Sequence, residues 1–153
     1  MNNTKKISLF FITCVMVWAC ETTEVPSTGG STVQTEEAQS IAESGNWRIT
    51  RFIDSGDNET SDFTGYTFTF ADNGELIATN GSNTLTGTWS ITNSSSSSSS
   101  SPDFNIFFPV PNSSNFEDLN DDWYIEQITQ SKIELIDISG GNGGTDRLTF
   151  TKN

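Results

Sequence analysis

The chain has 153 residues, 33% of them hydrophobic, and a formal net charge of −13 with no histidine. This length allows one domain with a small core, and the acidic surface excludes nucleic acid as an expected partner because it repels phosphate backbones. Without histidine the usual general base and the usual zinc ligand are missing, so we expect no enzyme, no catalytic residue, no metal and no cofactor.

Residues 1–19 have the pattern of a signal peptide. Lys5 and Lys6 precede an uncharged stretch, residues 7–19, that is too short to span a bilayer, for which about 20 apolar residues are needed. Its length suits the apolar region of a secretory signal instead. Removal of this segment leaves Cys20 as the single cysteine, so the mature chain must be stable without an internal disulfide.

The end of the apolar stretch, Val17-Trp18-Ala19-Cys20, resembles the lipobox of bacterial lipoproteins, although Trp18 stands where that pattern prefers a small residue. The resemblance implies cleavage before Cys20 and acylation of that cysteine with fatty acids such as palmitate. Two or three acyl chains anchor a protein stably to a membrane. The resemblance therefore implies a lipid-anchored protein of the bacterial cell envelope, in the outer membrane. The alternative is an ordinary signal peptide cut after Ala19, which leaves a secreted protein with a free thiol.

Residues 20–44 are the predicted lipidated cysteine and flexible tether. They are rich in Thr, Ser, Glu and Gly and contain too little apolar surface to become ordered. Within them, residues 36–43 have a pattern that allows one or two helical turns, which would close one end of the folded domain. The domain itself is placed at residues 45–153.

From residue 45 onward, apolar and polar residues alternate, which predicts β-strands. The first strand spans residues 46–54 and places Trp47, Ile49 and Ile53 on one face. The segments FTGYTFTFA, ELIAT and TLTGTWSI follow with the same period of two, and Asp72-Asn73-Gly74 makes a tight hairpin between the first two. This half of the domain therefore contains four strands joined by short turns.

Residues 94–101 are an unbroken serine run, which predicts a loop in solvent because polyserine has nothing to bury. The strands DFNIFFPV, NDDWYIEQI, KIELIDI and DRLTFTK follow, the last one after a glycine-rich hairpin loop. Eight short strands without a helix long enough for a crossover predict an all-β fold, an antiparallel up-and-down eight-stranded β-barrel in which each strand pairs with the next.

Gly45-Asn46-Trp47 resembles the GxW signature of lipocalins. In that family the tryptophan begins the first strand and plugs the closed end of the barrel, often beneath a basic residue from the last strand. The resemblance assigns this structural plug to Trp47 and Arg147. Residues 45–152 also resemble small lipocalin-like lipoproteins of Bacteroidota, in stretches such as GTWSI and FEDLNDDWYIE. Because the barrel segment is shorter than a typical ligand-carrying lipocalin, ligand transport is not carried over.

The candidate ligand-binding residues are the aromatic side chains on the predicted inward faces. An eight-stranded barrel is just wide enough to be filled by side chains or to hold one small ligand. The rings therefore have two interpretations: they line a site for a small apolar ligand, or they fill the barrel and leave a shallow pocket at its mouth. These residues are Tyr66, Phe68, Phe70, Trp89, Phe104, Phe108 and Trp123.

Two acidic segments, residues 54–62 and 117–122, are candidate calcium sites because calcium takes six to eight oxygen ligands. Neither has the spacing of an EF-hand, and solvated acidic loops are the commoner case, so no metal ligand is assigned.

The sequence thus predicts a monomeric, non-enzymatic envelope lipoprotein, bound to the membrane through its lipid, whose barrel binds a small apolar ligand. The alternative is a structural or interaction lipoprotein with a filled barrel that binds a protein or a glycan on its surface.

Overall fold

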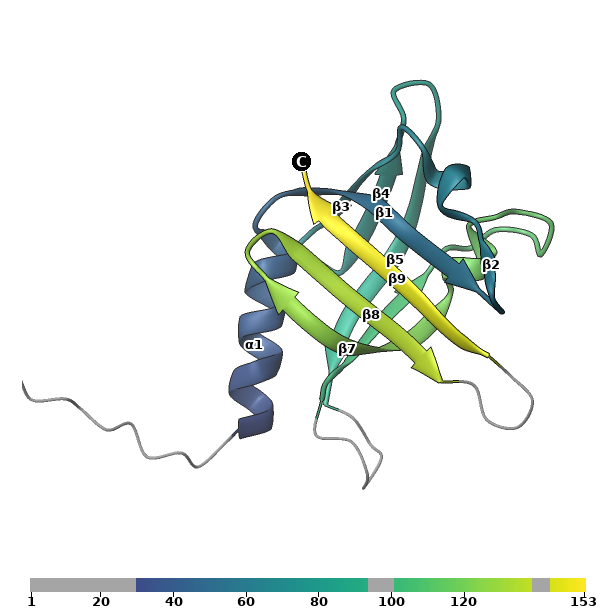
Figure 1. Ribbon diagram of the computed structural model, residues 1–153. Helices are drawn as coiled ribbons and strands as arrows, with labels where there is room; N and C mark the ends of the chain where they lie inside the picture. Colours follow the sequence, from purple (N-terminus) through teal and green to yellow (C-terminus); the bar gives the residue numbers. More distant parts are fainter. Residues whose placement is uncertain (1–29, 94–100, 139–143) are drawn as a thin grey trace, which may run out of the picture.

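The computed structural model describes residues 30–93, 101–138 and 144–153. These residues form a closed antiparallel β-barrel, and a helix, α1, lies across one of its ends (Figure 1). The eight-stranded antiparallel barrel predicted from the alternating pattern is confirmed.

Each strand of the barrel pairs with its neighbour in the chain, as predicted, and β1 pairs with β9 to close the sheet. Closure satisfies the backbone groups that an open sheet would leave at its edges. A further two-residue strand, β2 (Asp57–Asn58), pairs with the end of β1. The barrel strands are β1 (Asn46–Asp54), β3 (Thr67–Phe70), β4 (Glu75–Thr79), β5 (Thr84–Thr92), β6 (Asp103–Phe107), β7 (Asp121–Thr129), β8 (Lys132–Ile138) and β9 (Thr145–Lys152).

The inward face of β1 changes partway along the strand. Trp47 and Ile49 are buried as predicted, but the pairing with β9 skips one residue at Thr50 and forms a β-bulge there. Because side chains alternate with a period of two, the extra residue reverses the faces of the strand beyond it. Phe52 is therefore the fully buried residue, and the prediction that Ile53 shares the face of Trp47 is wrong: Ile53 is half-buried.

Helix α1 (Gly30–Glu43) occupies a stretch that the sequence suggested was part of a flexible tether. It is also longer than the one or two turns expected over residues 36–43. The helix buries Ala38, Ile41 and Ala42 against the end of the barrel. A helix of 14 residues is marginal in water by itself, so this packing is what stabilises it. The tether boundary is corrected accordingly, because the propensity of the isolated segment does not include the apolar surface offered by the barrel.

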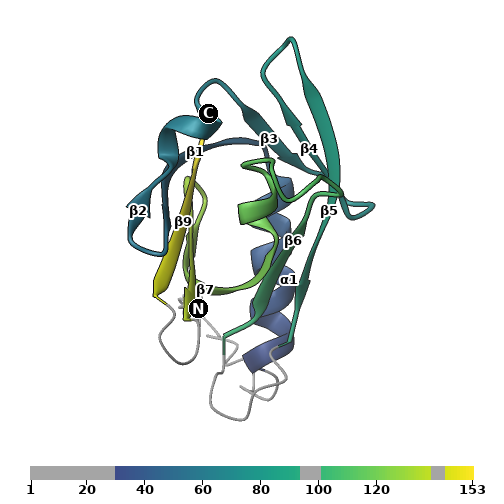
Figure 2. The same cartoon turned by 90° about the vertical axis from the view of Figure 1, so that its right-hand side faces the viewer.

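The opposite end of the barrel is covered by two short 3₁₀ helices, η1 (Thr60–Phe63) and η2 (Glu117–Leu119). Figure 2 looks into the barrel from this end, with α1 behind. Phe63, Phe116 and Leu119 are buried there, and the rings of Phe63 and Phe116 meet edge to face at 5.3 Å between centroids. The described residues therefore cover both ends of the barrel.

Several predicted segments lie outside the described residues. They are the signal peptide at residues 1–19, the lipidation site Cys20, the tether at residues 21–29, residues 94–100 of the serine run and residues 139–143 of the glycine-rich loop. Within the described ranges, no helix is both long enough and apolar enough to cross a membrane.

Candidate functional site

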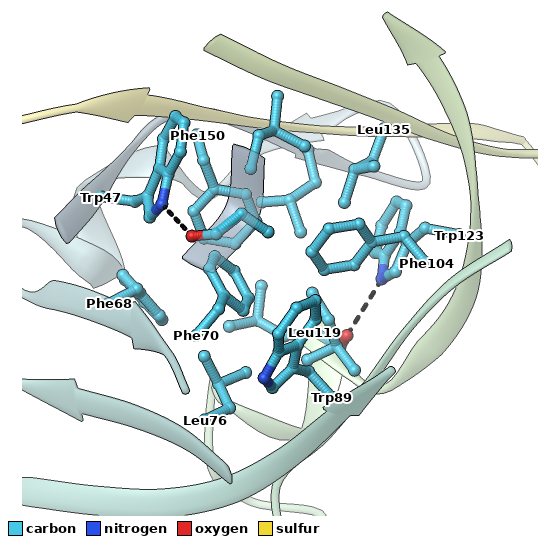
Figure 3. Packing of buried hydrophobic residues seen from close by; sticks show 14 of the residues in the cluster. Trp47, Phe68, Phe70, Leu76, Trp89, Phe104, Leu119, Trp123, Leu135 and Phe150 are labelled. Carbon is cyan, nitrogen blue, oxygen red and sulfur yellow. Dashed lines mark hydrogen bonds between the residues drawn. The ribbon is translucent and has the colours of Figure 1, made fainter. Parts of the chain in front are cut away.

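The aromatic residues predicted inside the barrel all belong to its core (Figure 3). Six of them are buried, and Tyr66 is partly buried against the others. The ring of Phe70 meets those of Trp89, Phe104 and Phe150 at centroid distances of 5.2, 5.3 and 5.4 Å. Rings in edge-to-face contact at these distances leave no room for a ligand between them. The space around Phe70 is therefore filled by side chains.

The end covered by η1 and η2 is filled in the same way. Phe63 contacts Phe52 at 5.5 Å between centroids, and Phe116 contacts Phe108 at 5.1 Å. Phe52, Phe63 and Phe116 were not among the predicted interior residues. The bulge turns Phe52 inward, and Phe63 lies in η1, although the sequence places it at the start of the strand FTGYTFTFA. Phe116 lies in a polar loop, and its signal in the sequence is a single aromatic residue among polar ones. The shallow pocket expected at the mouth is replaced by this aromatic cluster.

Trp47, which the GxW resemblance assigned to the plug, lies at the end of the barrel that α1 covers. It is 0% exposed, and its indole Nε1–H donates a hydrogen bond of 2.8 Å to the carbonyl oxygen of Ala42, near the end of α1 (Figure 3). This bond satisfies the indole N–H, which would otherwise be buried without a partner. Trp47 thus ties the first strand to the helix that covers the barrel.

The basic residue above Trp47 is Lys152, so the assignment of Arg147 to this role is wrong. Lys152 pairs with Trp47 in the β1–β9 ladder, and its Nζ lies 5.4 Å from the centroid of the Trp47 ring while it donates to Ser44 Oγ at 2.7 Å. A Cβ on Gly45 would stand 2.5 Å from Lys152 Cε, so a larger residue at position 45 would shift the end of the Lys152 side chain.

Arg147 lies five residues earlier on β9, opposite Ile53. Its guanidinium donates to Glu126 Oε2 at 2.9 Å, in a partly exposed ion pair. Both basic residues belong to the last strand, and only the register of β1 against β9 separates their roles. A ladder register depends on pairing across about a hundred residues of chain, so the residue types alone do not reveal it.

The mouth opposite α1 is acidic. Asp121 lies on the same side of β7 as Trp123, and burial raises its pKa from 3.8 to about 6, with a further contribution from the nearby carboxylate of Asp137. Desolvation also raises the pKa of Glu59 and of Asp118, and each is raised further by the other acidic groups of this end. The fold therefore brings together the two acidic segments that the sequence singled out.

This convergence does not form a metal site in the described residues, where no group of three acidic or cysteine side chains is arranged to hold an ion. One of the carboxylates, Asp62, instead accepts a hydrogen bond of 2.6 Å from the Asn115 side chain, and another, Asp146, accepts one of 2.7 Å from the Ser55 backbone. These carboxylates help to hold the loops at the mouth together.

The hollows described on this protein lie outside the barrel. One, the α1–β7 groove, has a volume of about 290 Å³ between the helix and β7, with Ile41, Ile125 and Ile128 among polar side chains. A second, of about 260 Å³, lies beside β1 and η1 and includes Arg48 and Thr64.

A third hollow lies on the outer surface of β5 and β6, which form neighbouring strands on the right-hand wall of the barrel in Figure 2. We name it the β5–β6 face. Its volume is about 290 Å³, and Phe107, 55% exposed, is its most exposed apolar side chain. The sequence analysis did not single out this face, because it sought ligand-binding residues on the inward side of each strand. Its lining residues are Thr88, Trp89, Ser90, Asn105, Ile106 and Phe107.

No protein-family model matches the chain, and no curated protein matches its sequence. Among solved structures, the chain is similar to the crystal structure, at 1.00 Å resolution, of a DUF4847 family protein from Bacteroides vulgatus ATCC 8482. The TM-score is 0.47 at 18% sequence identity, and the match covers 75% of this chain and 96% of that chain.

Proposed function

We propose that this chain is a non-catalytic envelope lipoprotein whose filled β-barrel serves as a rigid body and binds its partner on the outer surface. The observation that carries this proposal is the direct packing of the interior rings, in which Phe70 lies 5.2 to 5.4 Å from three other aromatic side chains. A ligand inside the barrel would have to displace these rings.

The chemistry of the core supports the same proposal over the carriage of a small apolar ligand in the barrel. Ligand sites usually contain a few polar groups that orient the ligand. Among the described residues, all of the buried side chains are hydrophobic. The indole N–H groups of Trp47 and Trp123 are already bonded to the carbonyl oxygens of Ala42 and Leu119.

The lipid anchor in this proposal rests on the N-terminal pattern alone, from Lys5 and Lys6 to Cys20. An anchor of two or three acyl chains would hold the barrel at a membrane while its outer wall stays accessible. The net charge of −13 would keep that wall away from anionic headgroups.

Native mass spectrometry of residues 21–153, after incubation with a bacterial envelope extract, tests whether the barrel carries a ligand. The filled barrel predicts the mass of the bare monomer. A matched variant, Ala78→Leu, enlarges a fully buried side chain on the inward face of β4. We expect it to lower the free energy of unfolding by about 1 to 3 kcal/mol through overpacking.

An added mass that is present in the wild-type protein and absent from Ala78→Leu would place a ligand inside the barrel and contradict this proposal. An added mass that persists in Ala78→Leu would instead support binding outside the barrel.

A further inference from the structure

Phe107 is exposed in a way that the fold does not require. It is the last residue of β6, and its neighbours Ile106 and Phe108 are buried, so the alternation of the strand directs its ring outward. In the described part of the chain, Phe107 and Ile138 are the two large hydrophobic side chains that are exposed, at 55% and 63%. An exposed aromatic ring on a rigid strand offers a flat apolar contact with little loss of side-chain entropy on binding.

Hydrogen-bonding groups surround this ring in regular rows. Phe107 is paired with Thr88, and Asn105 is paired with Ser90 on one side and with Asp122 on the other. The Asn105 amide nitrogen donates to Ser90 O at 3.3 Å, to Ser90 Oγ at 3.2 Å and to Thr92 Oγ1 at 3.1 Å. These bonds fix the amide, and its oxygen remains as an acceptor on the outer face.

The backbone of Phe107 lies unusually close to β5. A Cβ at Gly87 would overlap the carbonyl oxygen of Phe107 and stand 2.9 Å from the ring of Phe108. β5 therefore approaches the end of β6 more closely than a residue with a side chain would permit. The absence of a side chain at Gly87 thus helps to define the place of Phe107 at the hollow.

The charges near this face restrict the class of ligand. The groups paired across it include Glu75 beside Thr88 and Asp122 beside Asn105, and the hollow itself has no cationic lining residue. Together with the net charge of −13, these carboxylates repel anionic ligands. They accept hydrogen bonds from neutral hydroxyl groups, and the serine and threonine hydroxyls of the face both donate to such groups and accept from them.

The small size of the exposed apolar surface favours a small ligand over a protein partner at this face. A stable protein interface buries about 800 Å² on each partner and has a cluster of apolar side chains at its centre. The β5–β6 face offers one exposed ring among hydroxyl and amide groups, in a hollow of about 290 Å³. That combination suits a molecule with alternating C–H and O–H groups, because polarised C–H groups pack on the electron-rich face of an aromatic ring.

We propose that the β5–β6 face binds a neutral oligosaccharide, with one sugar ring stacked on Phe107 and its hydroxyl groups bonded to Thr88, Ser90 and Asn105. This site rests on the proposed function, in which the partner binds outside the barrel, and it specifies the class of that partner.

The test uses residues 21–153 and neutral tetrasaccharides of glucose, mannose, galactose, xylose and N-acetylglucosamine in α and β linkages, with tetragalacturonate as the anionic control. Saturation-transfer NMR detects binding, and calorimetry gives the affinity. We expect at least one neutral tetrasaccharide to bind with a Kd of about 1 mM or tighter, and tetragalacturonate not to bind.

Phe107→Ala should weaken that binding about tenfold or more, whereas Phe107→Tyr, which keeps an aromatic ring, should retain it. Ile138→Ala is the matched control, because it removes the other exposed apolar side chain and should leave the affinity unchanged. Thermal melting of each variant confirms that it is folded, as expected for changes at exposed positions.

If no neutral tetrasaccharide binds, or if Phe107→Ala and Ile138→Ala have the same affinity as the wild-type protein, the saccharide site is wrong. A protein that crosslinks to the wild type and not to folded Phe107→Ala, in the absence of saccharide binding, would overturn the saccharide site and leave the proposed surface function standing. A ligand found inside the barrel by the Ala78→Leu comparison would instead overturn the proposed function.

Discussion

Trp47 connects β1, α1 and the end of β9, so its removal should be among the most costly single changes. We expect Trp47→Ala to lower the free energy of unfolding by about 3 to 5 kcal/mol, because it leaves a cavity and removes the bond to Ala42. Urea denaturation measures this change. The exposed Phe107→Ala is the control and should change stability by less than about 0.5 kcal/mol. A loss below about 1 kcal/mol for Trp47→Ala would show that Trp47 is not the plug.

The two basic residues of β9 should differ in their effects on stability. Lys152→Ala removes the cation above the Trp47 ring and the bond to Ser44, at a cost of about 0.5 to 1 kcal/mol or more. Arg147→Ala removes a partly exposed ion pair with Glu126 and should cost less than about 0.5 kcal/mol. Chemical denaturation of both variants under the same conditions tests the order. The reverse order would restore Arg147 as the plug partner.

Asp121 should make the protein more stable in mild acid. Its folded-state pKa of about 6 lies above the usual aspartate value of 3.8, so the folded state binds the proton more tightly than the unfolded state. This contribution is complete below pH about 4 and is lost as the pH rises through about 6. Asp121→Asn should therefore stabilise the protein at pH 7.5 by on the order of 1 kcal/mol, a figure reduced for partial solvent exposure, with a much smaller effect at pH 4.

Thermal melting at the two pH values provides the test for Asp121. Asp72→Asn, at an exposed turn, is the control for the loss of one negative charge. An equal effect of Asp121→Asn at both pH values would mean that desolvation of Asp121 does not control this part of the pH profile.

Among the elements, α1 should be part of the cooperative fold. Ile41 is 5% exposed between the helix and the barrel, so Ile41→Ala should lower the free energy of unfolding by about 2 to 5 kcal/mol. Glu36→Ala, on the exposed side of the same helix, is the control and should be nearly neutral. Circular dichroism and tryptophan fluorescence should give one coincident transition. Loss of helical signal before the fluorescence change would show that α1 is detached from the barrel.

The strands and their order could be predicted from the sequence because each strand has its own period-two pattern and a turn after it. The inward positions of Phe68, Phe70 and Phe104 followed from that pattern. Phe52 and α1 could not be predicted in this way. Phe52 depends on a bulge at Thr50 that arises from pairing with β9, and α1 is ordered by contact with an end of the barrel that exists only after the strands have closed.

For the whole molecule, the lipid anchor predicts how the protein partitions. Cys20→Ser removes the thiol that the lipobox resemblance marks for acylation, so we expect the variant to move from the membrane fraction to the soluble fraction. Cell fractionation followed by immunoblotting measures this distribution. Trp18→Ala, which brings the motif nearer to the lipobox pattern, should remain in the membrane fraction. Retention of Cys20→Ser in the membrane fraction would contradict the anchor.

The sequence by itself determines the net charge, the limit to one small core and the number of barrel strands. Composition, chain length and local alternation encode these properties. The tertiary structure decided that side chains fill the barrel and that both of its ends are covered. It also decided that Lys152, and not Arg147, lies next to the Trp47 ring. Each of these features depends on contacts between residues that are distant in the chain. These contacts are the ring contacts of Phe70, the register of β1 against β9, and the packing of α1 on the end of the barrel. The exposed ring of Phe107 likewise became a candidate site only when β5 placed Thr88 and Ser90 beside β6.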